Sequence, residues 1–420
     1  MRALQHLRDA CKNGIRHSSL RSVRALYDWA MRFRDEPSPE GRALLTEIVL
    51  MSADVLQQSG ELDEWERAMR LGLACSQSAG NRKREAIVRG QLANIAWLRG
   101  ESEQAIEEAR RALDLVKEIE SVPVRSLALF ALANANFCLG NLDEAIALQS
   151  EQVAVLAGLD ASHLGAMLIP SVQARAYLAW FLAERGDFAR AEAEAAAAEA
   201  MLAGEDQPYS RLLACTVRGV LSLRRGQLAG AVASLEEARA ICLANELLVM
   251  EAPVSGWLAQ ALAHSGGQAR ALEIGRHSVN NKTYLHCAVM SWVTVFQGLA
   301  EAEFASGLVD DALATIDKAL ALATDKVGPI LVAQAKFARG VMLSEATHTD
   351  PRSPDADITA ALQIAEQLKL RPLTADCHRQ LARLAGREGD DGAVRYHAER
   401  AAALQRELGM TTVGASAGSG

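Results

Sequence analysis

Apolar residues recur at helical spacing in successive blocks along the chain, and short polar segments that contain a glycine separate the blocks. Leu127, Phe130 and Phe137, for example, lie three or seven residues apart, which places them on one face of a helix. Alanine is frequent, and only 10 of the 420 residues are proline. Because alanine favours helix and proline breaks it, the pattern predicts helices throughout the chain.

The separating glycines form a repeat. They follow one another at intervals of 40 or 41 residues, with one interval of 46, and are Gly60, Gly100, Gly140, Gly186, Gly226, Gly266 and Gly307. A small residue stands seven positions before each glycine and five positions after it, except that Trp65 follows Gly60. We expect each glycine to adopt positive φ and end a helix. The small residues are then placed where two paired helices cross, so each repeat is a helical hairpin.

Prolines support the same period. Six of them precede a predicted turn by 13 to 18 residues, where the first helix of a hairpin begins: Pro123, Pro170, Pro208, Pro253, Pro329 and Pro372. Proline is tolerated there because its missing N–H would have no partner within the helix. The remaining four prolines, at positions 37, 39, 351 and 354, fall in predicted loops.

The repeat extends over residues 1–410, which predicts a single array of about ten hairpins. Both ends depart from the pattern. Residues 1–35 form a degenerate first unit in which His17 occupies the glycine position, and the units over 329–410 are irregular. Here we expect a loop over 347–355, a helix over 356–370 and, after residue 410, a flexible tail over 411–420. Atypical terminal units are common in stacked arrays.

This register of small residue, glycine and alanine resembles the tetratricopeptide repeat (TPR), most clearly in LANIAWLRGESEQAIEEARRAL (92–113) and LANANFCLGNLDEAIAL (132–148). The long period is similar to the superhelical regions of bacterial maltose-activator-like regulators and of bacterial ATPase–cyclase proteins. The ending LARLAGREGDDGAVRYHAERAAALQRELGM (381–410) also resembles their closing repeat. The resemblance implies an all-α, right-handed α-solenoid superhelix with a concave groove that binds protein or peptide segments.

Net charge and cysteine content indicate which ligands and which cellular compartment to expect. The formal net charge of −8 argues against direct binding of nucleic acid, which needs a basic surface. The seven cysteines are scattered singly and the N-terminus lacks a secretory pattern, so we expect a cytoplasmic protein with free thiols. The most apolar window, 285–296, is too short to span a membrane.

No motif for chemistry stands out. The sequence has no phosphate-binding glycine loop, no metalloprotease motif and no nucleophile elbow. Cys377 and His378 are adjacent, so they point in different directions on a helix. We therefore expect no enzymatic activity, no catalytic residue, no cofactor and no metal site.

In the resembling family the first helix of each hairpin lines the groove. That register places Asn94, Asn134, Trp180, Gln260 and Glu301 six residues before the turn glycine, facing inward. Asn94 and Asn134 are unusual in mid-helix, and their amides could hold the backbone of an extended peptide. Further aromatic residues on this face could hold apolar side chains: Trp97, Phe130 and Phe137. The alternative is that the asparagines bridge neighbouring hairpins and the aromatic residues are core.

Basic residues are concentrated at the N-terminus, where residues 1–34 contain eight of them against two aspartates. This face could dock an anionic partner or an additional domain, or it could be an ordinary solvated helix face. The sequence thus predicts a non-catalytic scaffold that binds a protein or peptide in its concave groove. The alternative is a sensor or regulatory module of a larger bacterial signalling or transcription-regulating protein, with a small effector or a neighbouring domain as its ligand.

Overall fold

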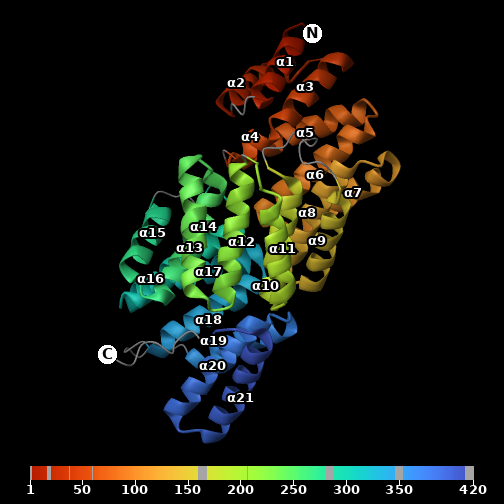
Figure 1. Cartoon of the computed structure of the whole chain (residues 1–420). Coiled ribbons are helices and arrows are strands. Elements are labelled where there is room, and N and C mark those ends of the chain that lie inside the picture. Colours follow the sequence, from red (N-terminus) through yellow and green to blue (C-terminus); the bar gives the residue numbers. More distant parts are fainter. Residues whose placement is uncertain are drawn as a thin grey trace. The chain divides into compact units, whose positions relative to one another are not determined.

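The computed structural model describes residues 2–16, 20–36, 38–58, 60–158, 168–205, 207–280, 285, 287–345 and 353–411. These residues form 21 α-helices, labelled α1 to α21 along the chain (Figure 1). The all-α fold predicted from the sequence is confirmed. Within the described ranges, no helix is long and apolar enough to cross a membrane.

Contacts between Cα atoms divide the chain into two compact units. Unit 1 comprises Met1–Ala135 and Ala147–Ser171, and unit 2 comprises Asn136–Ile146 and Val172–Gly420. The prediction of one continuous array over residues 1–410 stays a prediction. The predicted turn at residue 17, most of the loop over 347–355 and the tail from residue 412 lie outside the described residues.

Helices follow one another in pairs, and those up to the boundary of the two units are α1 (Arg2–Arg16), α2 (Leu20–Ala30), α3 (Pro39–Met51), α4 (Ala53–Gln58), α5 (Leu62–Ser78), α6 (Arg82–Leu98), α7 (Ser102–Ile119), α8 (Val122–Cys138) and α9 (Leu142–Leu156). A 3-10 turn, η1 (Met31–Phe33), follows α2. The helices α3 and α4 together take the place of one first helix, so residues 1–156 contain four hairpins.

The later helices, which lie in unit 2 apart from the first two residues of α10, are α10 (Pro170–Arg185), α11 (Phe188–Ala200), α12 (Pro208–Arg224), α13 (Leu228–Ala244), α14 (Leu248–Ser265), α15 (Gln268–Asn280), α16 (Val289–Ala305), α17 (Val309–Leu322), α18 (Pro329–Glu345), α19 (Pro354–Gln367), α20 (Arg371–Glu388) and α21 (Asp391–Leu408). A π-helical turn, η4 (Ala323–Val327), follows α17. These six hairpins bring the number in the described residues to ten, as the sequence predicted.

The turn glycines behave as predicted. All seven have φ between 70° and 90°, a conformation that side chains with a Cβ adopt only with strain. The small residues seven before and five after these glycines are buried in the described structure, and the helices that they join pack closely. A Cβ at Gly219, for instance, would lie 2.5 Å from Cγ of Leu235 on the paired helix. The size of the residues at these positions therefore determines how closely the backbones of two paired helices approach each other.

Three of the proline predictions were wrong. Pro253 was expected to begin a helix, but α14 begins five residues earlier, at Leu248. Because proline has no N–H, the carbonyl of Val249 loses its partner in the helix. Pro39 and Pro354 were assigned to loops, and instead they begin α3 and α19, after Ser38 and Ser353.

Within unit 2, turns contact helices far along the chain. Asp143, in the first turn of α9, pairs with Lys369 at 2.6 Å and with Arg185 at 3.1 Å. The backbone N–H of Thr411 donates to the carbonyl of Arg225 at 2.8 Å. The Lys369–Asp143 and Thr411–Arg225 contacts join segments that are separated by about half of the chain, so the last hairpins of unit 2 contact its earlier turns.

We predict that Gly298→Ala destabilises unit 2. A Cβ at Gly298 would lie 2.3 Å from the carbonyl oxygen of Gly256, where α16 crosses α14. Since backbone cannot yield as a side chain does, we expect the free energy of unfolding to fall by about 1–3 kcal/mol in denaturant titrations. Gly230→Ala is the control, because only Ser222 lies near, at 3.4 Å. It should raise stability by up to about 1 kcal/mol, and a loss in both variants would contradict close crossing as the cause.

A second prediction concerns the last hairpin. Nδ1 of His378 lies 2.8 Å from Nδ1 of His397, a distance that suits one neutral ring donating to the other. Burial lowers the pKa of both histidines, and for His378 the charges of His397 and Arg400 lower it further, although Glu366 opposes them. A histidine whose folded-state pKa is lowered contributes stability above its ordinary pKa and loses it as the pH falls.

Stability should therefore decline on acidification from about pH 7.5 to about pH 5, around the ordinary histidine pKa. The His378→Gln/His397→Gln double variant should show a flatter decline in its free energy of unfolding. Parallel curves for the two proteins would contradict a role for this pair.

Candidate functional site

A cavity of about 440 Å³ with polar and apolar walls lies within unit 2, and we call it the unit 2 cavity. Six helices contribute its principal walls: α10, α12, α14, α16, α18 and α20. Each is the first helix of its hairpin, which is the side that the TPR resemblance assigned to the groove. The residues that line it include Glu184, Leu223, Arg224, Gln260, His264, Gln297, Glu301, Phe304, Gln334, Phe337, Asp376, Arg379 and Arg383.

The predicted register describes part of this lining. Leu223, Ala263 and Phe304 stand three residues before their turn glycines, and Gln260 and Glu301 stand six before theirs. A spacing of three or four residues places such positions on one helical face. In three successive hairpins the same face therefore looks into the cavity.

Glu184 is the most buried charge of the cavity, with 4% of its surface exposed. Arg224 donates to it from Nη2 at 2.9 Å and from Nε at 3.0 Å and 3.1 Å. Nε1–H of Trp180 and the amide of Gln334 also donate to the carboxylate, each at 3.0 Å. A carboxylate removed from water needs such partners, because its desolvation is otherwise costly.

This network joins hairpins that are distant in sequence. Gln334 is 150 residues from Glu184, and the pair links α18 to α10. Burial lowers the pKa of Arg224, but the charge and hydrogen bonds of Glu184, with the charges of Glu301 and Asp376, raise it more, so the pKa lies above its ordinary value. Arg224 thus stays charged within the cavity.

A second carboxylate has a different partner. Oε2 of Glu301 lies 2.8 Å from Nε2 of His264, and Oε1 accepts from the Gln297 amide at 2.8 Å. Removal from water lowers the pKa of His264, but the hydrogen bond to Glu301 and the charges of Glu301 and Asp376 raise it above its ordinary value. On α20, Arg379 donates to Asp376 at 2.9 Å.

Glutamine recurs on four consecutive first helices, as Gln260, Gln297, Gln334 and Gln380, and all four are buried in the described structure. Gln260 is 5% exposed and lines the cavity, and no described residue hydrogen-bonds to its amide. A buried amide can donate twice and accept twice. Gln260 therefore offers hydrogen-bonding capacity to a group that enters the cavity.

The other predicted contact residues lie elsewhere. In unit 1, Asn94 is 3% exposed and Asn134 is 1% exposed, and Oδ1 of each accepts no hydrogen bond from a described residue. Nδ2 of Asn134 donates to the carbonyl of Phe130 at 2.9 Å. Trp97 and Phe130 are buried and pack edge to face, with ring centroids 5.6 Å apart. Their role as peptide contacts stays a prediction.

In unit 2, Phe137 is buried and stacks on Phe181 at 4.6 Å between centroids. The ring of Trp180 packs against Phe137 and Trp257, with centroid distances of 4.9 Å and 5.9 Å. Its N–H donates a hydrogen bond to Glu184. Trp180 thus supports the unit 2 cavity through a hydrogen bond, and its role as a peptide contact stays a prediction.

Sequence reasoning placed Glu301 on this face but missed the other charged residues of the cavity. Glu184, Arg224 and His264 each stand two residues before a turn glycine. Polar residues at this third position of the repeat would therefore have indicated them. This position lies one helical turn after the position six before the glycine, on the same face. The charged residues on α20 had no such marker, because the last unit departs from the repeat.

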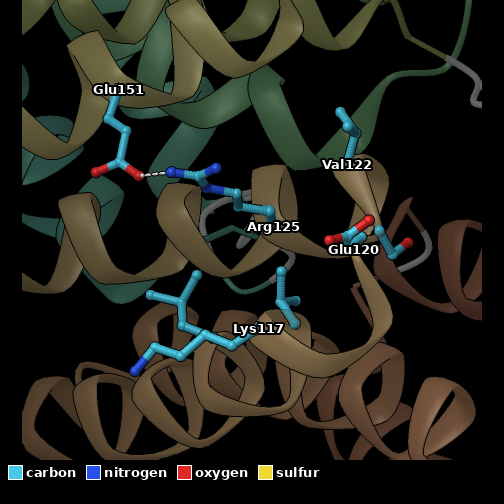
Figure 2. A pocket seen from close by; sticks show the side chains of 8 residues that line it. Lys117, Glu120, Val122, Arg125 and Glu151 are labelled. Atoms are coloured by element: carbon cyan, nitrogen blue, oxygen red, sulfur yellow. Dashed lines mark hydrogen bonds and ion pairs between the residues drawn. The ribbon is translucent and has the colours of Figure 1, made fainter.

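A second cavity, of about 550 Å³, lies in unit 1 between the end of α7 and the helices α8 and α9. Figure 2 shows the Arg125 guanidinium directed at Glu151, with Glu120 and Val122 away from this pair. The two groups are 2.6 Å apart, and both side chains are exposed. Because this ion pair lies at the surface, where such pairs contribute little, it does not mark a ligand site.

The basic N-terminal hairpin is partly neutralised. Arg24 pairs with Asp28 at 3.0 Å and with Glu61, and Arg8 pairs with Asp9 at 2.8 Å. A docking role for this face stays a prediction. Among the described residues, no three histidine, cysteine or acidic side chains are grouped so that they could hold a metal ion.

We predict that Arg224→Met lowers the free energy of unfolding by about 3–5 kcal/mol, because it leaves the buried Glu184 carboxylate without its counter-charge. Adding Glu184→Gln should restore much of that loss. Arg270→Met is the control, because Arg270 pairs with Glu236 at the surface at 2.8 Å, and it should cost less than about 1 kcal/mol. Equal losses for both arginine variants in denaturant titrations would contradict the burial of this pair.

Comparison with known proteins supports the fold. No family model matches the chain, and no curated protein matches it. A Rap protein complexed with competence and sporulation factor is 14% identical, with a TM-score of 0.50, and the match covers 97% of this chain and 98% of that one.

Two further structures are similar. A Rap conjugation gene regulator of plasmid pLS20, in complex with the Phr* peptide, is 11% identical, with a TM-score of 0.42 and coverage of 92% and 94%. A signal-transduction ATPase with a tetratricopeptide repeat sensor from Pyrococcus horikoshii is 14% identical, with a TM-score of 0.45, and covers 86% of this chain and 52% of that one. The resemblance to maltose-activator-like and ATPase–cyclase proteins stays a prediction. The chain is a TPR-like repeat protein, built from stacked helical hairpins.

Proposed function

We propose that the chain is a non-catalytic scaffold that binds a protein or peptide segment in the unit 2 cavity. The observation that carries this proposal is the position of Gln260, a buried amide without a partner among the described residues, on the wall of that cavity. An extended segment has unpaired backbone N–H and C=O groups, and an amide side chain complements both.

Apolar residues complete the proposed site. Leu223, Phe304 and Phe337 line the same cavity as Gln260, so a segment could bury apolar side chains beside its hydrogen bonds. Binding sites of this kind combine mostly apolar walls with a few placed polar groups. The Rap protein was crystallised with a factor bound, which supports the view that the fold accommodates a ligand.

A second candidate function is suggested by the size of the cavity. Its volume of about 440 Å³ is in the range of small-molecule sites, which is roughly 300–1,000 Å³. The chain would then be a sensor or regulatory module that binds a small effector. We rank this function second, because the walls of the cavity come from six successive hairpins, an arrangement that suits an extended ligand better than a compact one.

The test is binding of a library of synthetic peptides, measured by fluorescence anisotropy. We expect peptides that bind the wild type to bind Gln260→Ala about tenfold more weakly, because a buried hydrogen bond is lost. The Asn94→Ala/Asn134→Ala variant is the matched comparison, and on this proposal it keeps its affinity.

Three other outcomes would redirect the proposal. Loss of binding only in the asparagine variant would move the site to unit 1, where the sequence predicted it. Equal binding by all proteins would place the site outside both sets of residues. If no peptide binds but a small molecule raises the unfolding temperature of the wild type, the sensor function is favoured.

A further inference from the structure

The three carboxylates of the unit 2 cavity differ in their counter-charges. Glu184 is held by Arg224 at 2.9 Å, and Asp376 is held by Arg379 at 2.9 Å. Glu301 has instead the imidazole of His264, at 2.8 Å, and the uncharged amide of Gln297. Arginine is always charged, whereas histidine loses its charge near neutral pH. Glu301 is therefore the carboxylate of this cavity whose neutralisation is reversible.

Glu301 and His264 also differ in how far their side chains are exposed to water. The side chain of Glu301 is 12% exposed, whereas that of His264 is 47% exposed. The imidazole is therefore accessible to water, whereas the carboxylate is largely enclosed. Gln297, one helical turn before Glu301, holds the other oxygen at 2.8 Å, so the carboxylate keeps its orientation when His264 leaves.

The surroundings favour a positive charge at the place of the imidazole. Glu301 faces His264 from α16, and Asp376 and Arg379 act on it from α20. Arg224, on α12, acts on Glu301 but is bound by Glu184. The contribution of α18 to the network, Gln334, is uncharged. Glu301 and Asp376 therefore act on this place against Arg379, which Asp376 already pairs. Arg383, the other guanidinium that α20 contributes to the lining, donates to Oε1 of Gln380 at 3.3 Å and lies 3.9 Å from Glu345.

We propose that Glu301 is a cation subsite, at which an ammonium or guanidinium group of the bound segment takes the place of the His264 imidazole. Phe304, one turn after Glu301 on α16, lines the same cavity and offers apolar surface to the methylene stem that carries such a group. The inference rests on the proposed function in one respect, namely that ligands enter this cavity.

Binding at this subsite depends on pH. Protonated His264 and a ligand cation compete for Glu301, so affinity for the cation falls as the pH decreases through the pKa of His264. A lysine or arginine side chain keeps its charge throughout this range. The pH dependence of binding therefore arises from the titration of His264 and not from the ligand.

The probe is agmatine, which carries an ammonium group and a guanidinium group, with pentanamide as an uncharged compound of similar length. Binding to the full chain is measured by isothermal titration calorimetry at about pH 9 and about pH 6, because the pKa of His264 lies above the ordinary histidine value of about 6.5. We expect agmatine to bind the wild type more tightly at the higher pH, and pentanamide to bind at neither.

Two variants locate the subsite. Glu301→Gln should weaken agmatine binding by about tenfold or more, because a charge-assisted hydrogen bond is lost. His264→Gln should bind agmatine with the same affinity at both pH values. Glu236→Gln is the control, because Glu236 pairs with Arg270 on α15 and does not line the unit 2 cavity.

The inference is overturned if agmatine gives no heat of binding, if Glu301→Gln binds it as the wild type does, or if His264→Gln retains the pH dependence. The peptide library separates this failure from that of the proposed function. Peptides that bind at Gln260 without preference for lysine or arginine would refute the cation subsite alone. Binding of agmatine at Glu301 when no peptide binds would refute the scaffold function and leave the subsite.

Discussion

The close approach of helix backbones is the constraint on which the rest of this structure depends. Where α14 crosses α16, Gly256 and Gly298 leave space for nothing larger, because a Cβ on either residue would meet backbone within 3 Å. Within the hairpins, the small residues seven before and five after the turn glycines are also buried. Since helix separation at a crossing is set by the side chains there, the repeated small residues give each hairpin a similar geometry. Similar hairpins stack with their first helices on one side, and in unit 2 those helices enclose the cavity.

The cavity contains charges that stability alone does not explain. A buried ion pair is often no more stabilising than apolar residues of the same volume, because both charges have to leave water. Glu184 nevertheless receives hydrogen bonds from three side chains on three helices. We interpret this network as a fixed element that shapes one wall of the cavity. Glu301 and His264, in contrast, form a pair that can be exchanged, and the proposed ligand chemistry depends on that difference.

Much of the fold could be predicted from the sequence, because the repeat is local. The turn glycines, the paired helices and most helix starts follow from residues less than 40 positions apart. Pro253 shows the limit, since packing carries α14 past a residue that usually begins a helix. The site was predicted less well, because its contacts join distant hairpins. Gln260 was found from the register, but periodicity gives no sign that Gln334 meets Glu184, or that Lys369 meets Asp143, 226 residues away.

The most direct test of a ligand site in the unit 2 cavity is site-specific photo-crosslinking. A photoreactive phenylalanine derivative would replace Phe337, on the cavity wall, and in a second protein Tyr396, which is 56% exposed on α21. Both proteins would be irradiated with peptides that bind the wild type, and the products analysed by mass spectrometry. Cross-linking of the peptide at position 337 and not at position 396 is the result that this account predicts. Cross-linking at position 396 alone, with position 337 unreactive while binding is retained, would contradict it.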